Sequence, residues 1–318
     1  MADRPSEFAL IAELFAPLAT APGAFGLTDD AAIVPPRAGH DLVVTTDALV
    51  EGVHFLAGDP PASIAKKALR VNLSDLAAKG AEPAGYLLSL SLPERIDRTW
   101  LEGFARGLGE DQKVFVVPLL GGDTTATPGP LSLTITAMGH VPAGGMIRRS
   151  GARPGDGVYV SGTIGDAGGG LAVLRSGNGP AELIERYRLP SPRLALGRAL
   201  RSVASAAIDV SDGLIADLAH IADVSRVRIA VDAARIPRSP ALRALWGDTA
   251  DAVVRAATAG DDYEIAFTAS REEKVMEAAK QAGVPVTRIG RVEEGARVAL
   301  RDAEGREIAV ARAGFTHF

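Results

Sequence analysis

Cysteine is absent from this chain of 318 residues. Its absence excludes disulfide bonds, thiolate catalysis, zinc–thiolate sites and iron–sulfur clusters held by thiolates. Long apolar runs are absent too, since no stretch approaches the roughly 18 residues that a membrane-spanning helix needs. The N-terminus carries Asp3 and Glu7 and lacks the pattern of a secretory signal peptide. We therefore expect a cytoplasmic protein that does not bind a membrane.

Positive charge is also scarce, because 34 Lys and Arg stand against 39 Asp and Glu, for a net charge of −5. Binding to nucleic acid or to anionic lipid needs basic patches, so we expect neither as a partner. Anionic substrates remain compatible with this charge if metal ions supply the positive charge. The chain is 47% hydrophobic and carries no block of like charge, which predicts folded domains. Its length suits about two domains of roughly 100–200 residues each.

Two common nucleotide-binding motifs are missing. No Gly-Lys pair occurs, so there is no Walker A loop, and no G-x-G-x-x-G sequence is present. A bound nucleotide would therefore require another architecture. The Gly-rich segment SGTIGDAGGG (161–170) could cradle a phosphate through backbone N–H groups, or it could be a tight turn between a strand and a helix. The sequence leaves both interpretations open.

Strands and helices are predicted in both halves of the chain, which indicates an α/β or α+β fold. The segment 148–157 is rich in Arg, Gly and Pro and predicts a boundary between domains of residues 1–147 and 148–318. The predicted strands cover 41–50, 86–93, 113–123, 131–141 and 228–237, the starts of 158–174 and 206–218, and the end of 261–269. The predicted helices cover 6–20, 63–80, 97–110, 181–187, 192–202 and 270–282, with Ser6 and Ser63 as N-caps.

Several aspartates stand where apolar runs end. Asp47, Asp123 and Asp209 each close such a run, and side chains at strand ends can converge on the rim where α/β sheets bind ligands. Asp75 lies on a predicted helix and shares one face of it with Asn72. Converging carboxylates repel one another unless cations lie among them, and Mg²⁺ prefers oxygen ligands. The sequence therefore predicts a site for hard cations.

The stretch AAIDVSDGLIADL (206–218) combines an apolar run with acids and a hydroxyl. A helix that starts near Gly213 would offer free N–H groups to an anion. The alternative is that each aspartate is a turn residue or an N-cap, and Asp212 alone is a good N-cap. The recurrence of an acid beside a hydroxyl in VTTD, GGDTT and DVSDG favours the metal site.

Two other segments leave their roles open. His54, in VEGVHF, follows the predicted acidic rim and could contact a substrate or be an ordinary loop residue. The last five residues, GFTHF, concentrate two phenylalanines and a histidine in a chain with only 5% aromatic residues. They could be a docked tail or a face on which a ring stacks.

The order of these motifs resembles the thiamine-monophosphate kinase family, of the superfamily that includes aminoimidazole ribonucleotide synthetase. The matching stretches span nearly the whole chain: TDDAAIV (28–34), VVTTDALVEGVHF (43–55), KKALRVNLSDLAAKGAEP (66–83), GGDTT (121–125), RSGARPGDGVYVSGTIGDAGGGL (149–171), DVSDGL (209–214), AGDDYEIAFT (259–268) and GFTHF (314–318). The resemblance implies that ATP phosphorylates thiamine monophosphate. It also implies two domains, each a mixed sheet packed with helices. The N-terminal domain would bind ATP and Mg²⁺ and form most of a homodimer.

By position, the resemblance implies a role for a set of residues. The implied ligands of several Mg²⁺ ions are Asp30, Thr45, Thr46, Asp47, Asp75, Asp123, Asp209 and Asp212. The implied nucleotide contacts are Gly121, Gly122, Asp123, Arg149 and Ser211, and the implied substrate contacts are His54, Asp261 and Phe315. Catalysis would fall to Asp47, Asp123, Asp209 and Arg149, with Arg148 as the alternative to Arg149. Asp261 stands where the family usually has glutamate, and Phe315 where it often has tryptophan.

Two other functions remain open at this point. Another ATP-dependent enzyme of the superfamily, similar to aminoimidazole ribonucleotide synthetase, would share the architecture. Selenophosphate synthetase and the hydrogenase maturation factor HypE fit less well, because they normally need a cysteine or selenocysteine that this chain lacks. The other possibility is a nucleotide-binding or metal-binding protein without catalytic activity.

Overall fold

The computed structural model describes residues 6–316, which form two compact units. The first unit holds the chain up to Leu76 together with Glu82–Gly144, and the second holds Ala77–Ala81 together with the chain from Gly145 onward. Among the described residues, none of the helices combines the length and the apolar character needed to traverse a bilayer.

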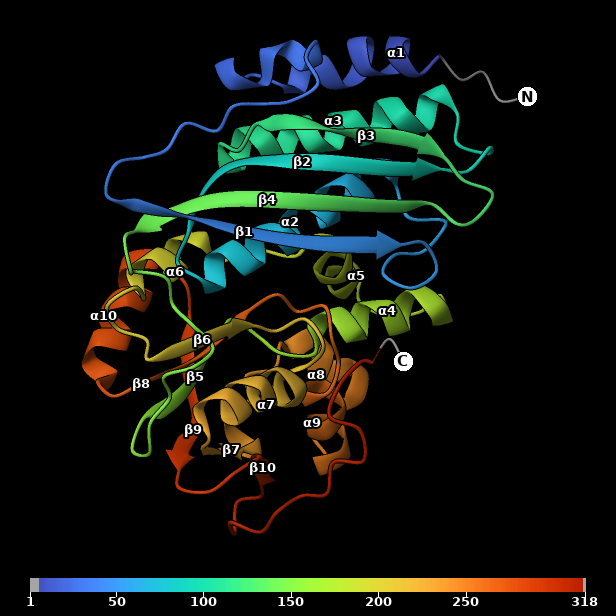
Figure 1. The fold of residues 1–318 in the computed structure, drawn as a ribbon. Helices are drawn as coiled ribbons and strands as arrows, with labels where there is room; N and C mark the ends of the chain where they lie inside the picture. Colours follow the sequence, from blue (N-terminus) through green and yellow to red (C-terminus); the bar gives the residue numbers. More distant parts are fainter. Residues whose placement is uncertain (1–5, 317–318) are drawn as a thin grey trace. The chain divides into compact units, whose positions relative to one another are not determined.

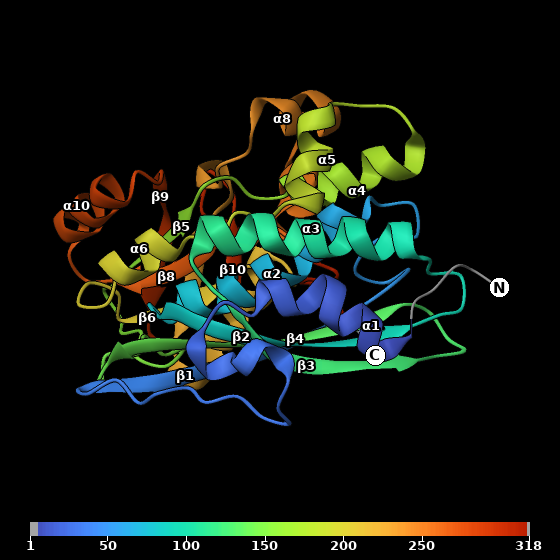
Figure 2. The ribbon, with the colours of Figure 1, turned by 90° about the horizontal axis from the view of Figure 1, so that it is seen from above.

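A four-stranded sheet forms the centre of the first unit (Figure 1). Its strands, in the order β1-β4-β2-β3, are β1 (His40–Val50), β4 (Ser132–Pro142), β2 (Glu82–Leu92) and β3 (Leu119–Ala126). The sheet is mixed, since β2 and β3 are parallel and the other pairs are antiparallel. The helices α2 (Pro61–Ala78) and α3 (Arg98–Phe115) cover one face of this sheet (Figures 1 and 2).

The sequence explains why these helices lie close to each other and to the sheet. α3 begins after Asp97, whose side chain accepts a hydrogen bond of 2.8 Å from the N–H of Trp100. A Cβ atom on Gly107 of α3 would lie 2.4 Å from the carbonyl oxygen of Ala62, so only glycine permits this approach to α2. Tyr86 of β2 is fully buried, and its hydroxyl accepts a hydrogen bond from Gln112 of α3.

The prediction of a strand over 113–123 is wrong in its first half. α3 continues through Phe115 and ends at Val116, which adopts a left-handed conformation with φ 52°, and β3 begins only at Leu119. Val114, Val116 and Val117 favour a strand locally, but α3, whose buried residues run from Leu101 to Asp111, continues as a helix to Phe115. Val116 is left 79% exposed by this arrangement.

The first helix differs from its prediction in type more than in place. Ser6 does cap it, by accepting a hydrogen bond from the N–H of Ala9. The helix is an α-helix only over α1 (Glu7–Leu10), then a π-helical turn η1 (Ile11–Phe15), and then 3₁₀ turns, η2 (Ala16–Leu18) and η3 (Pro22–Leu27). Ser63 is not the cap of α2, because that helix already begins at Pro61, a residue suited to a first helical position.

A six-stranded mixed sheet forms the centre of the second unit. Its strands, in the order β10-β7-β9-β5-β8-β6, are β10 (Val298–Arg301), β7 (Arg228–Asp232), β9 (Val286–Glu293), β5 (Gly157–Ser161), β8 (Ile265–Ala269) and β6 (Ala206–Asp209). Only β10 and β7 pair in parallel. The helices are α4 (Asp166–Ser176), α5 (Ala181–Arg188), α6 (Leu194–Ala199), α7 (Leu214–Ser225), α8 (Pro240–Trp246), α9 (Ala250–Ala257) and α10 (Glu272–Ala282), with a 3₁₀ turn η4 (Ala233–Arg235).

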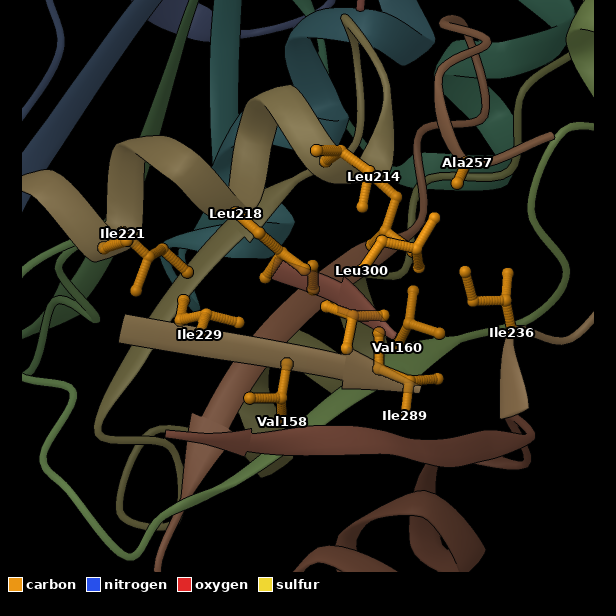
Figure 3. Close-up of a cluster of buried hydrophobic side chains, with 14 of the residues drawn as sticks. Val158, Val160, Leu214, Leu218, Ile221, Ile229, Ile236, Ala257, Ile289 and Leu300 are labelled. Atoms are coloured by element: carbon orange, nitrogen blue, oxygen red, sulfur yellow. The ribbon is translucent and has the colours of Figure 1, made fainter. Parts of the chain in front are cut away.

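The helix α7 packs its apolar face on this sheet (Figure 3). Leu214, Leu218 and Ile221 are spaced by four and three residues, so they project from one side of α7 toward Val160 and Ile229. Full burial of each such side chain contributes about 1.5–3 kcal/mol. This packing fixes the N-terminal end of α7, and therefore the turn that joins it to β6.

Both sheets are mixed and packed with helices, so the predicted α/β class is confirmed. The strand predicted over 228–237 ends at Asp232 and is followed by η4. The helices α8 and α9 were not predicted, although Ser239 and Thr249 cap their N-termini.

Candidate functional site

In the first unit, β1 and α2 bring predicted metal ligands together. Thr45 and Asp47 project to the helix-covered face of β1, since side chains alternate along a strand. The Thr45 hydroxyl donates a hydrogen bond of 2.5 Å to Oδ2 of Asp75. The N–H of Asp47 donates to Oδ1 of the buried Asn72 at 3.1 Å. These half-buried carboxylate and hydroxyl oxygens have the donor chemistry that hard cations prefer.

Asp123 projects to the other face of the same sheet. Asp123 pairs with Ser89 of β2, and this row of the sheet continues across β4 to Ala48, the neighbour of Asp47. Directly paired residues point to the same face, so Asp47 and Asp123 point to opposite faces. Neither of them closes a strand, because β1 continues to Val50 and β3 to Ala126. We had expected these two carboxylates to converge on one rim of the sheet. Within one chain, that expectation is wrong.

Two further predicted ligands, Thr46 and Asp30, make other contacts. The Thr46 hydroxyl donates to the carbonyl oxygen of Ile135 at 3.1 Å and lies 3.0 Å from the Thr136 hydroxyl, on the face opposite to α2. Asp30 is exposed, and its N–H donates to the carboxylate of Asp29 at 2.8 Å.

One of the two glycines of GGDTT has a structural role in the sheet. A Cβ atom on Gly122 would lie 1.8 Å from the carbonyl oxygen of Leu88, so β2 and β3 could not pair in this register with another residue there. At Gly121 the nearest contact of a Cβ atom would be an ordinary 3.4 Å. Strand pairing thus accounts for Gly122 without a nucleotide.

The geometry of His54 fixes which of its ring nitrogens carries a proton. The N–H of Val50 donates to Nδ1 of His54 at 3.0 Å, so Nδ1 is an acceptor and the proton lies on Nε2. The turn is held by the N–H of His54, which donates to the Val50 carbonyl, and by the buried Lys67, whose ammonium donates to the His54 carbonyl at 2.8 Å. His54 therefore carries its ring donor at Nε2.

In the second unit, the turn that follows β6 is tied to one carboxylate. Asp209 is the last residue of β6 and is buried. The N–H groups of Ser211, Asp212 and Gly213 all donate to Oδ2 of Asp217, at 3.0, 3.1 and 3.1 Å. None of these three N–H groups is therefore left for an anion, and Gly213, not Asp212, is the N-cap of α7, which has no side-chain cap. Burial raises the pKa of Asp217 to about 7, against the lowering effect of these three hydrogen bonds.

The two predicted substrate contacts of this unit are attached to the same turn. The N–H of Asp261 donates to the Ser211 carbonyl at 2.8 Å, and the N–H of Phe315 donates to the Asp212 carbonyl at 2.9 Å. A Cβ atom on Gly260 or Gly314 would lie 2.5 Å from one of these carbonyl oxygens, so both approaches require glycine. The structure thus brings together residues from three distant segments, and it leaves Phe315 43% exposed.

The Gly-rich segment 161–170 is a tight turn in this structure. Its N–H groups at Gly165 and Ala167 donate to the carboxylate of the buried Asp262, at 2.6 and 3.2 Å. Asp262 therefore occupies the position that a phosphate would take at the N-terminus of α4, and burial raises its pKa well above the ordinary value. A Cβ atom on Gly170 would lie 2.0 Å from the Leu183 carbonyl, so the glycines also allow close helix packing.

Glu264, two residues after Asp262, is also a buried acid. Its Oε1 accepts hydrogen bonds from Arg186 at 2.9 Å and from Arg193 at 2.5 Å. Its Oε2 accepts from Arg193 at 2.7 Å and from the Ser161 hydroxyl at 2.6 Å. The charge of Glu264 is thus fully compensated, which allows complete burial.

Comparisons with known proteins place the whole chain. Residues 28–141 match the family "AIR synthase related protein, N-terminal domain", and residues 153–303 match "AIR synthase related protein, C-terminal domain". A thiamine-monophosphate kinase of Caulobacter vibrioides is 46% identical over 321 residues, which cover 98% of this chain and 91% of that protein.

This chain belongs to the thiamine-monophosphate kinase family.

Solved structures agree with this family. The thiamine-monophosphate kinase from Stenotrophomonas maltophilia K279a has a TM-score of 0.81 at 44% identity, and the match covers 89% of this chain and 91% of that one. A structure described as "AaThiL complexed with AMPPCP and TMP" has a TM-score of 0.78 at 31% identity, with 93% and 97% covered. The resemblance seen in the motifs, the two-domain fold and the class of enzyme are therefore confirmed.

Some residues near the predicted sites of this family member escaped sequence analysis. Ligand atoms of Asp212, Asp217 and His220 lie within 4.8 Å of one another, and only Asp212 had been singled out. The spacing of Asp217 and His220 along α7 was the available signal, since residues three apart share a helix face. Arg148 and Arg149 are both exposed. The Arg148 carbonyl accepts a hydrogen bond from the N–H of Ala207, and the Arg149 carbonyl accepts one from the Ser225 hydroxyl.

Proposed function

We propose that this chain transfers the γ-phosphoryl group of ATP to thiamine monophosphate, forming thiamine diphosphate and ADP. The observation that carries the proposal is the match to the structure described with AMPPCP and TMP, which covers 93% of this chain at 31% identity. AMPPCP is an analogue of ATP, so that protein holds both kinds of substrate. The relatives named thiamine-monophosphate kinase support the same reaction.

Mg²⁺ is the metal that the residues fit. The Thr45 hydroxyl against the Asp75 carboxylate, with Asp47 from the same strand, offers only oxygen donors. We assign several Mg²⁺ ions to Asp30, Thr45, Thr46, Asp47, Asp75, Asp123, Asp209 and Asp212. When bound, Mg²⁺ supplies positive charge that offsets the phosphates of both substrates. For Thr46 we assign the backbone carbonyl as the ligand, because its hydroxyl is engaged on the other face of the sheet.

The residues of the chain position the reactants more than they transfer protons. An oxygen of the acceptor phosphate bonds to the γ-phosphorus while the bond from phosphorus to the bridging oxygen breaks, and ADP leaves with that electron pair. A phosphate monoester has a second pKa of about 6, so the acceptor oxygen is already ionised near neutral pH. No strong general base is therefore needed.

We assign the binding roles by the positions that match the motifs of the family. His54 donates a hydrogen bond from Nε2 to thiamine monophosphate, and the exposed ring of Phe315 stacks on a substrate ring. Asp261 contacts the same substrate. Ser211, Gly121, Gly122 and Arg149 contact the nucleotide, and the Arg149 guanidinium pairs with phosphate oxygens. We assign the electrostatic part of catalysis to Arg149, Asp47, Asp123 and Asp209, with each aspartate as a ligand of a Mg²⁺ ion.

We also propose a homodimer that forms through the first unit. Leu42, Val44 and Leu87 lie on the sheet face that the helices do not cover, and they are 47%, 56% and 37% exposed. An apolar patch of this kind is typical of an interaction surface. Light scattering behind a sizing column measures the mass directly, and a monomer would contradict this part of the proposal. A cytoplasmic location and the assignment of ATP and Mg²⁺ binding to residues 1–147 belong to the same proposal.

The test is an incubation of the protein with ATP, Mg²⁺ and thiamine monophosphate. We expect thiamine diphosphate and ADP in equal amounts, both lost when EDTA is added. Formylglycinamidine ribonucleotide as the acceptor is the matched control and should give no ADP. ADP formed only with that control acceptor would replace the proposal by a reaction like that of aminoimidazole ribonucleotide synthetase.

A further inference from the structure

Every backbone N–H and carbonyl group of the turn at 211–213 has a hydrogen-bond partner inside the protein. All three N–H groups donate to Oδ2 of Asp217. The carbonyls of Ser211 and Asp212 accept from the N–H groups of Asp261 and Phe315. The carbonyl of Gly213 accepts from the N–H of Asp217 itself at 2.9 Å. The backbone of the turn is therefore fully used inside the protein.

This saturation decides what the turn can offer to a ligand. A helix N-terminus with free N–H groups attracts phosphate. Here the N–H groups of 211–213 all donate to the carboxylate of Asp217, itself only 2% exposed, so the turn offers none of them to a phosphate. The groups of the turn that remain for a ligand are the side chains of Ser211 and Asp212, which are oxygen donors.

We propose that Asp217 is a positioning residue that holds the turn 211–213 in the conformation in which Ser211 and Asp212 serve the reaction. Its carboxylate acts through the three N–H groups and does not touch a substrate. The inference rests on the proposed function for its kinetic part, because Ser211 and Asp212 are assigned there to nucleotide and metal. The conformation of the turn itself can be tested without any activity.

Removal of the carboxylate would leave three N–H groups without their acceptor inside the protein. The turn would then expose these donors to water or to a phosphate, and the side chains on it would lose their fixed direction. Residues that orient metal ligands typically change metal affinity or activity by about 10–100-fold when they are replaced. The same loss would reach Asp261 and Phe315, which are attached to the carbonyls of the turn.

The experiment compares Asp217→Ala and Asp217→Asn with two variants in the same helix. Asp223→Asn removes an exposed carboxylate of α7 and leaves the turn intact. Ile221→Val truncates a buried side chain of α7 and lowers the melting temperature without touching the turn. Asparagine at 217 keeps an oxygen that can accept these hydrogen bonds, so this variant should fold even if the alanine variant does not accumulate.

Two measurements test the inference. Hydrogen exchange of a peptide covering 210–216, in the absence of substrates, should show protection of the turn in the wild type and its loss in Asp217→Ala, with an intermediate result for Asp217→Asn. In the kinetic assay, Asp217→Ala should raise the Mg²⁺ concentration for half-maximal rate and lower kcat/KM by about 10–100-fold, with partial recovery in Asp217→Asn. Asp223→Asn should match the wild type in both.

Two results would overturn the inference. One is unchanged exchange in Asp217→Ala. The other is an equal kinetic loss in Ile221→Val at the same melting temperature, because the effect would then follow stability alone. A wild type that makes no thiamine diphosphate would instead contradict the proposed function, while the exchange result still judges the role of Asp217.

Discussion

Glu264 is fully buried, and its carboxylate is held by Ser161, Arg186 and Arg193. Replacement by glutamine keeps the shape of the side chain and removes its charge, which leaves two arginines without their counterion. Breaking a buried ion pair in this way costs about 3–5 kcal/mol. The arginine side chains are each 21% exposed, so water offsets part of the loss. We therefore expect Glu264→Gln to lower the free energy of unfolding by about 3 kcal/mol.

The assay can report on the second unit alone. The chain has two tryptophans, and Trp246 belongs to α8 of the second unit, where the Arg255 guanidinium lies 4.0 Å from its ring centre. In a Trp100→Phe background, urea unfolding followed by tryptophan fluorescence gives the free energy of unfolding of this unit. For a unit of roughly 150–250 residues, the expected change lowers the melting temperature by about 6–12 °C.

The matched control is Glu304→Gln, which removes the same charge from an exposed side chain. Glu304 pairs with Arg306, and their side chains are 64% and 74% exposed. Such a pair contributes little, so the control should stay within about 0.5 kcal/mol of the background protein. A cost for Glu264→Gln no larger than that of this control would refute the reasoning, since the buried charge would then not be needed to hold the arginines.

Three further predictions follow from the sites. Asp47→Asn and Asp209→Asn should abolish Mg²⁺-dependent formation of thiamine diphosphate while circular dichroism shows a retained fold, and wild-type turnover in both would disprove the metal assignment. His54→Asn keeps an oxygen that can accept the hydrogen bond from the N–H of Val50, but it lacks the Nε2–H donor. KM for thiamine monophosphate should therefore rise about tenfold, the factor expected for one lost hydrogen bond. The melting temperature should change little. Glu293 has its pKa lowered from 4.5 to about 2 by hydrogen bonds from two arginines. Its folded-state pKa lies below the unfolded one, so it stabilises the protein above about pH 4.5 and that contribution is lost as the pH falls toward 2. Melting temperatures across this range should fall less steeply for Glu293→Gln, and parallel curves would contradict the assignment.

Much of the fold could be predicted because its signals are local. β4 alternates apolar and polar residues, and both β1 and β4 form strands within one residue of the predicted ranges. α8 carried a signal that was overlooked, since Ser239 and Pro240 are a typical cap and first helical residue. The strand predicted from residue 113 is wrong in its first half. The last residues of α3 locally favour a strand, yet the helix continues to Phe115.

The candidate site was predicted in its residue types better than in its contacts. The contact between Thr45 and Asp75 joins positions 30 residues apart, and both residues had been predicted as metal ligands. The opposite facing of Asp47 and Asp123 depends on the register of three strand pairs, which no local pattern encodes. Asp217 was missed as the acceptor for the turn 211–213, and Asp262 as the acceptor at the N-terminus of α4, because an internal anion and an external one satisfy the same N–H groups.

The stretch from Asp261 to Glu264 assigns adjacent residues to unrelated tasks. Asp261 is tied to the turn at Ser211, Asp262 caps α4, and Glu264 holds two arginines. A survey that scored only survival or growth would mark all these positions as intolerant and suggest one common cause. Expression level and melting behaviour would divide them, because loss at Asp262 or Glu264 would reduce the amount of folded protein. Under the proposed function, loss at Asp261 would instead leave folded protein that binds substrate poorly. Clinical or environmental variants in such a stretch therefore need a measurement of protein abundance before they are interpreted as active-site changes.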